Sequence, residues 1–219
     1  MVQFPKSTVF GRRVPKEMFY KNLDVKPEIK RFFIDQIKRI TWANKLSPET
    51  MNLAPGKNVQ EIEVFHIQLT DNELDDRVVT LMDQGIPYHL LFILERPDGK
   101  QRLSIAYKEQ TTKKDAAFQL KECYHTPWME KEDLSLNFTA LNMDALYESF
   151  VRQIAGDALQ AQNDESLQES VERQQEREKI QKQIKKLQAQ MRREKRLAKQ
   201  MELRREIARL EIGLNDCEN

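Results

Sequence analysis

The chain of 219 residues is poor in cysteine and histidine and has no long apolar run. Its two cysteines, Cys123 and Cys217, form no CxxC pair, which excludes a disulfide framework and a thiolate zinc site. The histidines at 66, 89 and 125 are too scattered for a metal centre. No segment approaches the roughly 20 apolar residues of a membrane helix, and the N-terminus lacks a signal-peptide core. We therefore expect a cytoplasmic protein without metal, cofactor or membrane partner.

Catalytic signatures are also missing from the sequence. There is no glycine-rich phosphate loop, GxSxG elbow, HExxH pair or kinase pattern. His66 and His89 fall in apolar stretches that favour strands, where a half-buried structural histidine is the usual occupant. Cys123 is interpreted in the same way, as an inert buried thiol. The pattern assigns no catalytic residue and favours a protein that is not an enzyme.

Proline and aromatic residues are absent after Gly156, where only one glycine, Gly213, remains. Glutamate, glutamine, lysine, arginine, leucine and isoleucine dominate this segment. A stretch of helix formers without turn residues is typical of a long helix or a helical hairpin. The change in composition predicts an α+β globular domain over residues 1–156 and a basic helical extension over residues 157–219.

Two helices are predicted before the first strong turn of the globular part. One starts at Pro27 and ends before Ser47, because apolar side chains recur at helical spacing: Ile29, Phe33, Ile37 and Ile40. A second covers residues 74–85, after a capping box at Thr70 and Glu73. A third helix, capped by Asn142 and ended by Gly156, buries three apolar side chains: Leu146, Phe150 and Ile154.

Strands are predicted over residues 61–69, 88–94, 101–108 and 118–124, because these segments are apolar, aromatic or alternating. The turn Pro97-Asp98-Gly99-Lys100 joins the second and third as a hairpin. Alternation over residues 102–107 suggests that the third strand buries one face only. The fold class is therefore α+β: a mainly antiparallel sheet of about four or five strands with packed helices.

Two apolar seams lie in the extension, each with the four-three-four spacing of a coiled coil. The first comprises Ile180, Ile184, Leu187 and Met191, and the second Leu203, Ile207, Leu210 and Leu214. The seams are out of phase with each other. The extension is therefore one helix with a stutter or two helices that fold back near residues 192–200, and the sequence leaves both open.

The net charge of +1 hides a strong segregation of charge. Residues 179–205 carry eleven basic and two acidic side chains, or +9, so the rest of the chain carries −8. This segment indicates sequence-independent binding of DNA phosphates, although a solvated coiled coil is the commoner explanation of such a pattern. The nucleic-acid-binding candidates are Lys185, Lys186, Arg192, Arg193, Lys195, Arg196, Lys199, Arg204 and Arg205.

Two further groups invite a functional interpretation. A polar surface site is predicted around the end of the first long helix, from Trp42, Asn44, Lys45, Glu49 and Asn52, with helix capping and packing as the alternative. Ala106-Tyr107-Lys108 follows the hairpin where a restriction-type nuclease has Glu-x-Lys. Ala106 cannot bind Mg²⁺, so any nuclease of this fold would be degenerate.

Several segments together resemble the bacterial domain-of-unknown-function family 4391. They are Val14-Pro15-Lys16, ITWANKLSPETMNL, EIEVF, IPYHLLFIL, AYKE and ESFVRQI, followed by the basic coil. The resemblance covers nearly the whole chain. It implies a neighbourhood of DNA methyltransferases and helicase-type ATPases in restriction-like or anti-phage loci.

The leading hypothesis is a non-catalytic accessory subunit of such a system, with a helicase or methyltransferase subunit as partner and DNA contact through the basic helix. The alternatives are a structural protein that forms a homodimer through its coil and the degenerate metal-dependent nuclease.

Overall fold

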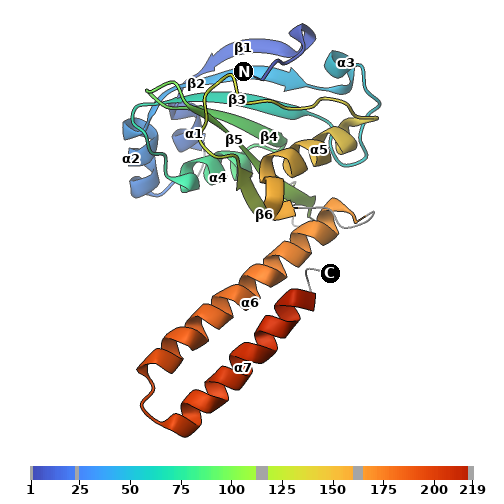
Figure 1. The fold of residues 1–219 in the computed structure, drawn as a ribbon. Helices are drawn as coiled ribbons and strands as arrows, with labels where there is room; N and C mark the ends of the chain where they lie inside the picture. Colours follow the sequence, from blue (N-terminus) through green and yellow to red (C-terminus); the bar gives the residue numbers. More distant parts are fainter. Residues whose placement is uncertain (1, 23–24, 112–117, 160–164, 217–219) are drawn as a thin grey trace. The chain divides into compact units, whose positions relative to one another are not determined.

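A computed structural model describes residues 2–22, 25–111, 118–159 and 165–216 of the chain (Figure 1). The chain divides into two compact units, Met1–Gly156 and Asp157–Asn219. The first contains a sheet with its helices, and the second contains two long helices. Short 3₁₀ helices, η1 (Lys6–Thr8) and η2 (Gly156–Leu159), lie near the start of the chain and at the start of the second unit.

The first unit is built on a sheet whose six strands follow chain order in space. They are β1 (Val9–Val14), β2 (Ile37–Leu46), β3 (Ile62–Leu69), β4 (His89–Glu95), β5 (Gln101–Gln110) and β6 (Phe118–His125). All neighbouring strands are antiparallel except β3 and β4, which are parallel. The α+β class is confirmed. The sheet is larger than predicted, because β1 and β2 were not expected as strands, and it is mixed, because β3 and β4 are parallel.

Helix α4 (Asp76–Gly85) makes the parallel pair, since it returns the chain to the end of the sheet where β3 began. The predicted capping box at Thr70 is wrong. The N-cap is Asp75, whose carboxylate accepts the backbone N–H of Arg77 at 3.0 Å. Asp75 is itself held by the side chain of Gln36, which accepts its N–H at 2.9 Å.

The long helix predicted from Pro27 to before Ser47 starts where expected, but its length is wrong. Helix α2 (Pro27–Asp35) ends at Gln36, and β2 begins at once. A bulge between Ile37 and Arg39 explains the misleading pattern. It inserts one residue, so Ile37 and Ile40, three apart, face the same core cluster. A bulged strand can therefore imitate the spacing of a helix.

Helices cover both faces of the sheet. Helix α1 (Glu17–Asn22), α2 and α4 contribute to a core cluster that includes Phe92 of β4. Helix α5 (Met143–Ala155) places the Tyr147 ring 4.3 Å from the His89 ring. His89 and Phe92 are three residues apart on β4, so they point to opposite faces. Strand β5 is consequently buried on both faces, which corrects the prediction of one buried face.

The last helix of the first unit forms as predicted. The side chain of Asn142 caps α5 by accepting the N–H of Ala145, and Gly156 ends it with a φ of +54°. Its Tyr147 hydroxyl donates to the carbonyl of Ala106 at 2.6 Å and accepts the N–H of Lys108 at 3.0 Å. One buried hydroxyl thus satisfies two backbone groups of β5.

The second unit is a helical hairpin of α6 (Leu167–Arg193) and α7 (Leu197–Asp216) (Figure 1). The two apolar seams found in the sequence pack against each other, with Ile184, Leu187 and Ile207 buried at the centre. Between the two alternatives left open by the sequence, the chain therefore folds back. None of the helices within the described ranges is both long and apolar enough to cross a membrane.

Replacement of Tyr147 by phenylalanine should destabilise the first unit by about 2 kcal/mol, because it leaves a buried N–H and C=O of β5 without a partner. The free energy of urea unfolding measures this loss. Tyr20→Phe is the matched control, since its exposed hydroxyl pairs with Glu17 where water can take over. An equal loss of unfolding free energy in the two variants would contradict the role of the Tyr147 hydroxyl in holding two backbone groups of β5.

Leu187→Asp should melt the hairpin and leave the first unit folded, because it puts a charge into the seam. All aromatic residues precede residue 157. Circular dichroism at 222 nm should therefore fall, and the near-ultraviolet spectrum should not change. Gln183→Asp, at a neighbouring exposed position, should alter neither signal. A loss of both signals in Leu187→Asp would contradict independent units.

Candidate functional site

The turn between α6 and α7 is fixed by one carboxylate. Glu194 Oε1 accepts the backbone N–H groups of Lys195 and Arg196, both at 3.0 Å. The side chain of Gln200 donates to the Glu194 carbonyl at 2.6 Å. Together these bonds satisfy backbone groups between the end of α6 and the first residue of α7. No glycine or proline marks this turn, so the sequence offered a fold-back near residues 192–200 only as one of two alternatives, and it did not single out Glu194.

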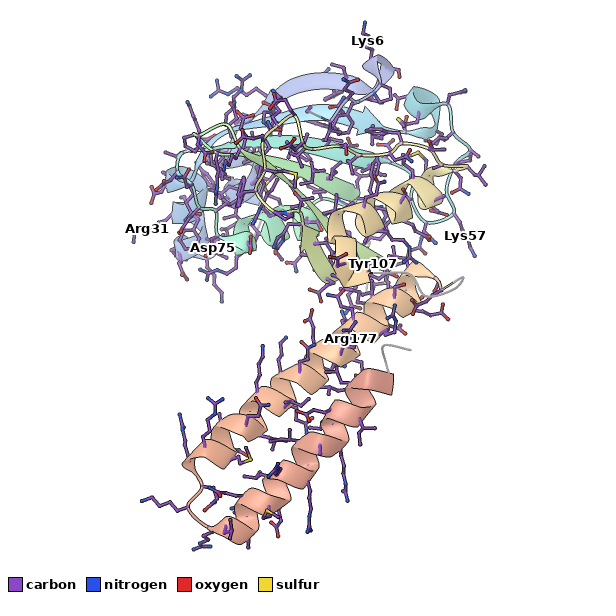
Figure 2. The ribbon with its side chains drawn as sticks, viewed as in Figure 1. Lys6, Arg31, Lys57, Asp75, Tyr107 and Arg177 are labelled. Atoms are coloured by element: carbon purple, nitrogen blue, oxygen red, sulfur yellow. The ribbon has the colours of Figure 1, made fainter. Side chains whose placement is uncertain are left out.

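Nine basic side chains surround this turn, which we call the hairpin tip (residues 185–205). All nine are exposed: Lys185, Lys186, Arg192, Arg193, Lys195, Arg196, Lys199, Arg204 and Arg205. With the two acids Glu194 and Glu202 the tip carries +7. At 1.5 Å per residue the fold-back confines this charge to about 15 Å along the hairpin, half the length of a continuous helix. Figure 2 shows side chains that end in nitrogen around this turn.

Charges of opposite sign are separated along the hairpin instead of mixed. Residues 165–178 hold five glutamates and two arginines, so the end opposite the tip is acidic. Lys179 and Lys182 pair with Glu176 and Glu178 outside the tip. Among the described residues of the tip, only Lys199 has an ion pair, a long one of 3.9 Å to Glu194. A surface of this kind attracts anions strongly.

The residues predicted as a polar surface site do not form one cluster: Trp42, Asn44 and Lys45 lie on β2, whereas Glu49 and Asn52 belong to a short helix that follows it. A bulge between Trp42 and Asn44 places the side chains of Trp42 and Lys45 on the same face of the sheet. On the neighbouring strand β3 they pair with Phe65 and Glu63. There Trp42 Nε1 donates to Glu63 Oε2 at 2.6 Å, and Lys45 Nζ lies 2.8 Å from Glu61 Oε2. Two carboxylates that sequence reasoning did not select therefore join these two residues.

The other members of that predicted site have structural contacts elsewhere. Asn44 is buried and donates to the hydroxyl of Thr8 at 2.9 Å. Glu49 lies in the first turn of α3 (Pro48–Met51) and accepts from Ser47 Oγ at 2.7 Å. Asn52 ends α3 in the left-handed conformation, with a φ of 52°. The described geometry gives all three the capping and packing contacts of the alternative interpretation.

Glu63 is the electrostatic centre of this network. Its side chain is buried, and burial together with a hydrogen bond to Glu61 raises its pKa to about 7. The indole of Trp42 acts in the opposite direction. Below about pH 7 the Glu63 carboxyl group therefore keeps its proton and is uncharged.

Lys108, the lysine of the nuclease hypothesis, lies inside the protein. Its ammonium group is 3.0 Å from Asp83 Oδ1 and donates to the carbonyls of Asp83 and Tyr88 at 2.7 Å. Burial lowers the pKa of Lys108 and raises that of Asp83, and their attraction opposes both changes. Ala106 lies opposite Cys123 in the β5–β6 pair. Lys108 is thus bound to α4 and to the start of β4.

Two side chains predicted to be structural lie near this pair: His89 is buried, and Cys123 is half-buried. The His89 ring packs edge-on against Phe118 and Tyr147, and burial, with the nearby Lys108 charge, lowers its pKa to about 3. Burial raises the pKa of the Cys123 thiol to about 11. Both groups are therefore uncharged at neutral pH.

A cavity of about 310 Å³ opens beside His89, with Glu61, Tyr88 and Phe118 in its wall. The carboxylate of Asp144 fixes the loop on its other side by accepting the backbone N–H groups of residues 57, 58 and 59. Gly56 allows this approach, because a Cβ there would lie 2.5 Å from Asp144 Oδ1. The loop wall is therefore rigid.

A third polar group, on β3, β4 and β5, also escaped sequence reasoning. His66 Nε2 lies 2.9 Å from Glu95 Oε2, and Glu95 accepts from the side chains of Gln68 and Gln101 at 3.0 and 2.6 Å. Burial raises the pKa of Glu95, but these bonds outweigh it and hold the pKa below its usual value. Within the part of the chain that the structure describes, no three His, Cys, Asp or Glu side chains are arranged to hold a metal ion.

One protein family covers the two units together. Its model, described as a domain of unknown function (DUF4391), matches residues 2–214. The chain belongs to this family. No curated protein and no solved structure matches the chain. The family match confirms the resemblance inferred from the sequence, and it spans both the sheet and the hairpin.

The pKa of Glu63 predicts a pH-dependent stability. Its folded pKa of about 7 exceeds the ordinary value of 4.5, so the folded protein keeps a proton that the unfolded chain releases. This stabilisation is complete below about pH 4.5 and disappears as the pH rises through 7. Urea unfolding of wild type and Glu63→Gln between pH 5 and 8 measures it. The advantage of wild type should shrink by up to about 3 kcal/mol, and a constant difference would contradict the assignment.

Proposed function

We propose that the protein is a non-catalytic accessory subunit whose hairpin tip holds the phosphate backbone of DNA. The observation that carries this proposal is the convergence of nine exposed cations on one fixed turn. A +7 surface about 15 Å long is comparable in length to several phosphates of a duplex, which carries one charge per 1.7 Å of axis. The tip has no aromatic side chain, so it holds the backbone and does not read bases by stacking.

The charge distribution of the tip is better explained by phosphate binding than by solubility alone. A helix kept soluble by charge mixes lysine with glutamate along its surface, and the pairs neutralise each other. Here the tip holds only two acids against nine cations, the other acids lie toward the opposite end of the hairpin, and folding back places like charges beside one another. Repulsion of this kind weakens an isolated hairpin and is relieved when an anion binds, so the arrangement suits a polyanionic ligand.

The larger context of the proposal is a DNA-targeting defence complex. Members of the family are expected beside DNA methyltransferases and helicase-type ATPases, so the sheet unit would dock on such a subunit while the tip holds DNA. Co-purification of partners with and without nuclease treatment separates the two contacts. A partner retained after nuclease treatment supports direct docking, whereas a partner lost on treatment is held through DNA alone.

The tip itself is tested by a salt titration of duplex binding. Wild type should bind a 20-base-pair duplex at 50 mM salt, and the affinity should fall steeply with salt. Changing Arg192, Arg193, Lys195 and Arg196 to glutamine should flatten the slope of log K against log salt by up to about 3.6. The control changes Lys179 and Lys182 to glutamine, two basic residues that are paired outside the tip. Absence of binding, or an equal loss in the control, would overturn the proposal.

A further inference from the structure

The hairpin tip carries exposed apolar side chains among its cations. Leu197, the first residue of α7, is 74% exposed, and Met201 is 48% exposed. They are four residues apart, so they lie on the same side of the first turns of α7. With Met191 of α6 they border a concavity of about 470 Å³, whose remaining walls are Arg192, Gln200 and Arg204.

The position of these side chains is set by the turn. Glu194 binds the N–H groups immediately before Leu197, and Gln200 ties the first turn of α7 back to the Glu194 carbonyl. Leu197 and Met201 are therefore presented on an ordered helix end. The seam of the hairpin ends at Met191 and Leu203, so the seam does not bury them.

Phosphate binding alone gives these side chains no function. Phosphates and sugars are polar, and the apolar surface that a nucleic acid offers is the faces of its bases. An aliphatic side chain reaches a base face by entering between neighbouring base pairs, as leucine and methionine do in proteins that kink DNA. The +7 charge around the apolar side chains selects a polyanion as the occupant.

We infer that Leu197 and Met201 form an apolar wedge that enters the base stack, while Arg192 and Arg204 hold phosphates beside it. This inference rests on the proposed function and adds a substrate class to it. Opening a stack costs a few kcal/mol, and this cost is smaller where bases are already unpaired. The tip therefore prefers duplex DNA with a mismatch or a bulge over a fully paired duplex.

The experiment compares two 20-base-pair duplexes of one sequence, fully paired and with a two-base mismatch, each with 2-aminopurine at the centre. Wild type should bind the mismatched duplex about tenfold more tightly and raise the 2-aminopurine fluorescence, which reports unstacking. The double variant Leu197→Gln, Met201→Gln should lose both effects and keep the salt slope. Ile212→Gln is the matched control, because Ile212 is 62% exposed on α7 but lies far along the helix from the tip.

Each outcome of this comparison decides a different point. Salt-dependent binding without mismatch preference, or with a preference that the double variant retains, would overturn the wedge and leave phosphate binding intact. No salt-dependent binding by wild type would overturn the proposed function and the wedge with it. An effect of Ile212→Gln equal to that of the double variant would also overturn the wedge, since any exposed apolar side chain would then suffice.

Discussion

The contact between two apolar seams sets the character of the second unit. Ile184, Leu187 and Ile207 are buried between helices whose outer surfaces are almost entirely charged or polar. Hydrophobic contact along this seam opposes the repulsion of nine cations that folding back brings together. The turn at Glu194 adds hydrogen bonds at the point where that repulsion is greatest. Charge density at the tip is thus a product of packing, and a single extended helix would not have it.

Much of the fold could be predicted from the sequence, and the errors have a common physical origin. Strands β3 to β6, the turn at Gly99 and the caps of α5 follow from local residue preferences. The helix predicted across Ile37 and Ile40 failed because a bulge changes the side-chain period of a strand. Bulges depend on pairing with a neighbouring strand, and such long-range pairing leaves little local signal.

For the candidate site too, the sequence predicts the individual residues better than their arrangement. The basic residues of the tip could be selected from charge alone, but their convergence could not, because no glycine or proline marks the turn. Trp42 and Lys45 were selected without their partners Glu61 and Glu63, which lie on another strand and meet them through the bulge at residue 43. Local sequence therefore predicts which side chains are unusual, and tertiary pairing determines which of them act together.

The order of the strands has a consequence for copies of the protein at high concentration. Because the sheet is open, β1 and β6 are its edges, and an exposed edge offers backbone groups to a strand of another molecule. Strand β1 has a bulge between Val9 and Arg12 and two exposed arginines, Arg12 and Arg13. The irregular backbone and the like charges of β1 both disfavour pairing with the edge strand of another molecule. This edge of the sheet is therefore protected against aggregation.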